Sequence, residues 1–154
     1  MAGKYESLDS DRLAEVILSG PVGIFILIAA ADGEIDNKEV MSFINSVGEI
    51  GGKQQVPSQI RAIFKALPNS VKNLIDEYTP KQETPEKLYD LVLESSECVK
   101  ETYSEEIAQR FNGILVELAT NIAKASGGFF GLGSKIDRSE KKVIEQLKSM
   151  LRVK

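Results

Sequence analysis

Apolar residues recur with helical spacing along almost the whole chain, and no segment alternates convincingly between apolar and polar positions with a period of two. Two helices are predicted near the start, over residues 10–18 and 20–31. Pro21 would stand in the first turn of the second helix, where its missing N–H has no cost. A third helix is predicted over residues 37–50, and the glycine pair at residues 51–52 ends it.

The rest of the chain continues this helical pattern. A short helix around residues 60–66 is expected between two prolines, and another helix follows to about residue 78. The dipeptide Thr84-Pro85 is typical of a helix start. The pattern then runs to about residue 125, and the last helix is predicted over residues 138–151.

A break is expected inside the long helical stretch near residues 101–104, because Thr102 and Glu105 have the spacing of a capping box. No low-complexity linker divides the chain, and its length of 154 residues matches the size of one domain. We therefore expect an all-α fold, with one compact domain of seven to eight helices over residues 10–152 and a tail over residues 1–9.

The composition restricts the chemistry that the chain can perform. There is no histidine and only one cysteine, which excludes Ser-His-Asp triads, Cys-His pairs, histidine-containing zinc sites and disulfides. Carboxylates, lysine, tyrosine and hydroxyl groups remain, so we expect that the protein is not an enzyme. The cysteine, Cys98, is expected to be an inert, partly buried thiol, because the neighbouring Glu97 and Glu101 disfavour the thiolate.

The N-terminal segment has no basic region followed by an apolar stretch, as a secretory signal would. The longest apolar run, over residues 20–31, is shorter than the roughly 20 residues needed to span a bilayer. We interpret this run as a buried core helix. With one cysteine and no export signal, the expected location is the cytoplasm.

Charge is distributed unevenly, although the net charge is only −4. Residues 135–154 contain seven Lys or Arg and three acids, and the rest of the chain is acidic. A basic segment can contact nucleic acid or anionic lipid. Because acids are interspersed and aromatic residues are absent from it, we favour a solvated helix face and expect no nucleic-acid binding.

A stripe of five acids follows one face of the helix that is predicted to start at residue 85. Like charges four residues apart each cost a few tenths of a kcal/mol, so this face is not optimised for helix stability. We interpret the stripe as solvated outer surface, and the alternative is a docking face for a basic partner or for the chain's own basic C-terminal helix. The five acids are Glu86, Asp90, Glu94, Glu97 and Glu101.

The most informative feature is a motif that occurs twice, over residues 31–39 and 125–140. In each copy an apolar helix is predicted to end at Ala-x-Gly, and Ile-Asp-x-x-Glu then opens an amphipathic helix. The second copy carries an insert over residues 128–134. We therefore predict that the chain consists of two related helical halves with pseudo-two-fold character.

Helix capping explains much of this motif. Asp36 and Glu39 have the spacing of a capping box in the first copy. Asp137 and Glu140 repeat that spacing in the second copy. Capping does not explain Asp32, because a carboxylate in the last turn of a helix faces the negative end of the helix dipole.

The alternative to capping is a cation site at the first corner. Clustered carboxylates and the free carbonyls of an ending helix suit a hard cation such as calcium or magnesium. A standard EF-hand is excluded, since its first and third ligand positions would fall on Ile28 and Ala30. Capping alone and a cation site built on the corner both remain open.

The stretch Ile28-Ala29-Ala30-Ala31-Asp32-Gly33-Glu34-Ile35-Asp36-x-x-Glu39, with Ile136-Asp137-x-x-Glu140 in a later hairpin, resembles the TerB tellurite-resistance-like domain. The likeness covers roughly residues 10–152 and extends to the N-terminal region of the DjlA co-chaperone. It implies an all-α fold of two pseudo-symmetric halves and a non-enzymatic role in bacterial tellurite and chemical-stress response. It also implies that the acidic corners bind a divalent cation, which for this chain would be calcium, magnesium or zinc.

Carried over by position, the acidic residues of the family fall on Asp32, Asp36, Glu39, Asp137 and Glu140. This chain departs from the family pattern at the second corner, where Ser126 stands in place of the first Asp and seven residues are inserted. The second cation site is therefore less expected than the first.

The insert is part of an apolar, glycine-rich loop over residues 127–133. Phe129, Phe130 and Leu132 either fold back onto the helices or form a contact patch for a protein partner, a second copy of the chain or a membrane surface. The alternative function is accordingly a docking scaffold whose acidic corners only cap helices. A carboxylate-based hydrolase is a third hypothesis, but the sequence shows no enclosed pocket with convergent acids.

Overall fold

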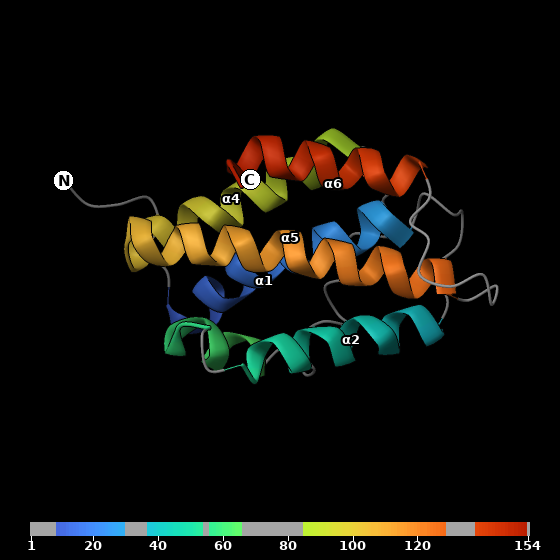
Figure 1. Ribbon diagram of the computed structural model, residues 1–154. Helices are drawn as coiled ribbons and strands as arrows, with labels where there is room; N and C mark the ends of the chain where they lie inside the picture. Colours follow the sequence, from blue (N-terminus) through green and yellow to red (C-terminus); the bar gives the residue numbers. More distant parts are fainter. Residues whose placement is uncertain (1–8, 30–36, 54–55, 66–84, 129–137, 154) are drawn as a thin grey trace.

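The computed structural model describes residues 9–29, 37–53, 56–65, 85–128 and 138–153 (Figure 1). All regular structure in these ranges is helical, which confirms the all-α prediction. Residues 58–65 are helical, in agreement with the short helix expected there. The labelled helices are α1 (Ser10–Ala29), α2 (Asn37–Gly51), α4 (Pro85–Thr102), α5 (Glu105–Gly128) and α6 (Arg138–Leu151).

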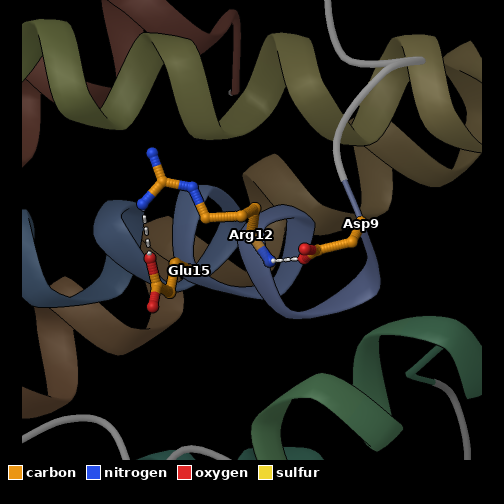
Figure 2. Close-up of polar contacts among 3 residues, drawn as sticks. All are labelled: Asp9, Arg12 and Glu15. Carbon is orange, nitrogen blue, oxygen red and sulfur yellow. Dashed lines mark hydrogen bonds and ion pairs between the residues drawn. The ribbon is translucent and has the colours of Figure 1, made fainter.

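Asp9 caps the N-terminus of α1 (Figure 2). Its Oδ1 accepts a hydrogen bond from the backbone N–H of Arg12 at 2.8 Å, and its carbonyl oxygen accepts one from the N–H of Leu13 at 3.0 Å. In the first turns of the helix, Arg12 Nη1 lies 3.3 Å from Glu15 Oε2 in an exposed ion pair (Figure 2). An aspartate at this position satisfies one of the free N–H groups of the first turn, so α1 begins at Ser10 as predicted.

The prediction of two separate helices before residue 31 is wrong. α1 is one helix of 20 residues with Pro21 in its interior. Every residue from Ile17 to Ala29 is buried, and α1 packs against α4 more extensively than against any other labelled helix. This burial confirms that the apolar run, as far as Ala29, is a core helix.

The structure shows how α1 continues through a proline. Pro21 has no N–H to donate to the carbonyl of Ile17, four residues earlier. Ser95 of α4 replaces that donor, because its Oγ donates to the Ile17 carbonyl oxygen at 2.5 Å. Gly20 allows α4 to come this close, since a Cβ atom at residue 20 would lie 2.5 Å from Ser95 Oγ. We call these four residues (Ile17, Gly20, Pro21 and Ser95) the α1–α4 seam.

The break between α4 and α5 is confirmed, but its cap is not the predicted one. Ser104 caps α5, because its Oγ accepts a hydrogen bond from the N–H of Ile107 at 3.1 Å. Thr102 still belongs to α4, where its Oγ1 lies 3.9 Å from Cys98 Sγ. A residue within one helix cannot take the extended conformation that an N-cap of the next helix requires.

α2 closes one side of the core. It ends at Gly51 as the glycine pair predicts, and Gly52 donates its N–H to the carbonyl of Gly48 at 3.0 Å. Phe43 of α2 stacks on Phe25 of α1 with ring centroids 4.7 Å apart. The stacked ring of Phe43 attaches α2 by its apolar face, as its amphipathic sequence predicts.

α6 has the predicted bounds and buries Ile144, Leu147 and Leu151. Its end is formed by Arg152, which has a positive φ of 56°. Val153 donates its N–H to the carbonyl of Lys148 at 2.9 Å, and this hydrogen bond closes a turn of six residues. This is the Schellman type of helix end, with arginine at the position that glycine usually occupies.

Candidate functional site

The two acidic motifs lie between helices that the structure describes. α1 ends at Ala29 and α2 begins at Asn37, so these helices flank the first motif. α5 ends at Gly128 and α6 begins at Arg138, so these helices flank the second motif. In Figure 1 the C-terminal ends of α1 and α5 and the N-terminal ends of α2 and α6 all lie at the same, right-hand end of the bundle. The helix ends that flank both motifs therefore share one end of the fold.

Only part of the predicted cation site falls within the described residues. Asp32, Asp36 and Asp137 lie outside them. Glu39 is in the first turn of α2, but its side chain is also outside the description. Glu140 is described completely, and it is 1% exposed. The convergence of these carboxylates on one point remains a prediction.

Glu140 lies in the first turn of α6, where the positive end of the helix dipole favours a negative charge. Because α6 begins at Arg138, Glu140 is the third residue of the helix. This is the position that the capping-box hypothesis assigns to it. Burial of a carboxylate is costly unless hydrogen bonds or charges compensate for it. The other member of the predicted capping box, Asp137, lies outside the described residues, so capping of this helix stays a prediction.

Elsewhere in the described ranges, no group of three or more Asp, Glu, Cys or His side chains is arranged to hold a metal ion. The acidic stripe of α4 lies on the outer surface. Glu86, Asp90, Glu97 and Glu101 are exposed, and Glu94 is half-buried. Of the apolar residues on the opposite face, Leu88, Val92 and Val99 are buried and Leu91 is half-buried. The placement of the stripe on the outside is thus confirmed.

Cys98 is 0% exposed on α4. Burial raises the pKa of its thiol, the hydrogen bond with Thr102 lowers it, and the charges of Glu101 and Glu94 raise it further. The thiol is therefore held in its protonated, unreactive form, in agreement with the predicted inertness. It is more deeply buried than the sequence suggested.

Phe129, Phe130 and Leu132 lie outside the described residues, so the docking-scaffold alternative stays a prediction. The stretch Asp11–Ala29 is long and apolar enough to cross a membrane, with a mean hydropathy of 1.8, but 72% of an 18-residue segment within it is buried inside the protein. The core helix of a globular fold passes the same test, so the stretch carries no argument for a membrane span.

The sequence did not indicate the buried polar contact of Ser95 with α1. The signal was Pro21, because a proline within a helix leaves the carbonyl four residues earlier without its N–H. If Pro21 started a new helix, no carbonyl would lack a donor, so this prediction gave no reason to look for one. A hydroxyl elsewhere in the chain had to supply the missing donor, and the local pattern does not say which one.

No family model matches the sequence, and neither a curated protein nor a solved structure shows significant similarity to it. The likeness to the TerB domain accordingly stays a prediction that depends on the two motifs.

Proposed function

We propose that the protein is a non-enzymatic, cytoplasmic binding module similar to the TerB domain, with a role in a bacterial tellurite or chemical-stress response. The acidic corner between α1 and α2 would present Asp32, Asp36 and Glu39 to a divalent cation or to a basic partner. The observation that carries the proposal is the position of the flanking helix ends. The helix ends that flank both motifs lie at one end of the bundle (Figure 1).

The proposal includes a fold of seven to eight helices in two related halves. In each half a long helix, α1 or α5, is followed by the motif and then by a shorter helix, α2 or α6. The buried core includes many apolar residues of both longer helices. The matching order of elements supports an internal duplication.

The first corner is proposed as the principal cation site. Three carboxylates and the last carbonyls of α1 would supply oxygen ligands, which calcium and magnesium prefer. The second corner is the weaker candidate, because Ser126 replaces an aspartate and Glu140 is buried in the first turn of α6. Asp137 and Glu140 are therefore assigned mainly to capping.

Thermal unfolding with calcium, magnesium or zinc tests the proposal. A cation at about 100 times its Kd stabilises the folded state by about 2.7 kcal/mol. For a domain of this size, that corresponds to a rise in Tm of about 5–10 °C. The double substitution Asp32→Asn with Glu39→Gln should abolish the rise.

The matched control is Asp11→Asn with Glu49→Gln, which likewise removes two negative charges at exposed positions outside the motifs and should leave the shift intact. An unchanged melting curve with all three cations at millimolar concentration would exclude the cation. Titration with oligolysine then tests the basic partner, and absence of binding there as well would overturn the proposal.

A further inference from the structure

The outer face of α6, together with Arg152 directly after it, is basic. Four of its cations are exposed, the fifth, Lys148, is half-buried, and Glu145 is the one acid that lies among them. None of the five forms an ion pair with a residue that the structure describes. The five cations of this basic face are Arg138, Lys141, Lys142, Lys148 and Arg152.

The outer face of α4 has the opposite charge. Its four exposed acids also lack ion pairs with any residue in the described ranges. Leu93, one of the few large apolar side chains that are exposed, is 39% exposed on the same face. Helical spacing places Leu93 between Asp90 and Glu97. The acidic face therefore consists of Glu86, Asp90, Leu93, Glu97 and Glu101, and the exposed Lys100, seven residues after Leu93, lies at its border.

These two faces belong to neighbouring helices, since α4 and α6 touch. Asn112 of α5 forms a hydrogen bond with each of these two helices. Its Oδ1 accepts a hydrogen bond from Ser96 of α4 at 2.6 Å, and its Nδ2 donates to the carbonyl of Leu151 at 3.5 Å. In the described part of the chain the two charged faces nevertheless form no ion pair with each other, because each helix turns its apolar side to the core and its charged side outward.

We propose that the protein self-associates through these faces, with the basic face of α6 from one copy docked on the acidic face of α4 from a second copy. Because α4 and α6 are neighbours, a two-fold axis passing between them repeats the contact twice in one dimer. Leu93 gives the contact an apolar centre with charges around it, the usual order in protein interfaces.

A second copy fits the charges better than other partners do. A nucleic acid or an anionic lipid surface would match α6 but would be repelled by α4 and by the net charge of −4. A basic protein would match α4 alone. Only a molecule that carries both faces satisfies both at once. Exposed ion pairs are individually weak, so the dimer is expected to be dynamic and sensitive to salt.

Sedimentation of the full chain at low and high salt is the first test. At an ionic strength of about 0.01 M, where the Debye length is about 30 Å, we expect the mass to rise with concentration from 16.9 kDa toward twice that value. At about 1 M salt the monomer mass should return. A monomer at every concentration in low salt would overturn the proposal.

Charge reversal identifies the surfaces. Glu97→Lys with Glu101→Lys, and separately Lys141→Glu with Lys142→Glu, should each abolish the dimer. An equimolar mixture of the two variants should restore it, because each then presents the charge that the other lacks. Failure of the mixture to associate, or a wild-type mass for either variant alone, would overturn the assignment.

Controls on other exposed positions separate these surfaces from a general effect of net charge. Glu15→Lys with Glu49→Lys makes the same change of net charge as the first variant. Gln59→Glu with Lys65→Glu makes the protein more negative, as the second variant does. Both controls should keep the wild-type dimer. Loss of the dimer in the controls as well would show that net charge, and not these two faces, governs association.

Discussion

From Ile17 to Ala29, α1 is buried on every side, whereas α6 buries only one stripe, with Ile144, Leu147 and Leu151 at its centre. Each helix has, within it or directly after it, one residue that does not suit its place. In α1 this residue is Pro21, and Ser95 of another helix supplies the hydrogen bond that the proline cannot make. Directly after α6 it is Arg152 with its positive φ, and the turn closes through backbone hydrogen bonds to Lys148 and Ser149 of α6. The buried helix thus receives its missing hydrogen bond from a neighbouring helix, whereas the surface helix is capped by backbone hydrogen bonds at its own end.

The largest effect is expected from Leu147→Ala, because α6 is held by few apolar side chains. Leu147 is fully buried, and loss of such a side chain costs about 2–5 kcal/mol of unfolding free energy. Chemical denaturation measures this loss. Gln146→Ala, at an exposed position of the same helix, should stay within about 0.5 kcal/mol of wild type. Equal effects of the two changes would show that α6 contributes little to the core.

Gly20→Ala tests the close approach at the α1–α4 seam. The new Cβ would lie 2.5 Å from Ser95 Oγ and 2.7 Å from Ser95 Cβ, so the helices must move apart at a cost of about 1–3 kcal/mol. In α5, the control Gly113→Ala meets nothing within 4 Å and should stabilise the protein by about 0.5–1 kcal/mol through helix propensity. Opposite signs in denaturation experiments are expected, and a stabilising Gly20→Ala would contradict the seam.

Ser95→Ala removes the hydroxyl that serves the Ile17 carbonyl. Since Pro21 cannot donate in its place, the buried carbonyl is left without a hydrogen bond, at a cost of about 1–2 kcal/mol. Thr120→Ala in α5 is the control, because the carbonyl that Thr120 Oγ1 contacts already has its helical N–H donor. The unfolding free energy should fall for Ser95→Ala and change little for Thr120→Ala. Similar values would mean that the hydroxyl does not compensate for the proline.

The smallest effect is a gain at the end of α6. Arg152→Gly removes the steric cost of a left-handed backbone and should stabilise the protein by about 0.5–1 kcal/mol. Arg152→Ala removes the same charge but keeps a Cβ atom, so it should give no such gain. If both variants gain equally, charge and not backbone conformation is the cause.

Local patterns predicted most of the described helices. Glycines after residue 50 end α2, Pro85 begins α4, and the apolar stripe of α6 fixes its bounds at 138 and 151. The cap of α5 was assigned wrongly, because Thr102 and Ser104 are both plausible N-caps and only the length of α4 decides between them. For the candidate site, the position of Glu140 in its helix was predictable, and its burial was not.

The sequence by itself determined that the chain is helical, because the spacing of apolar residues is a local property, and it excluded histidine-based and disulfide chemistry. Only the tertiary structure decided that α1 passes through Pro21 without a break. The donor that makes this continuity stable, Ser95, lies 78 residues away from Ile17. Helix periodicity carries no information about such a distant partner, because the hydrogen bond forms only after α1 and α4 have packed against each other.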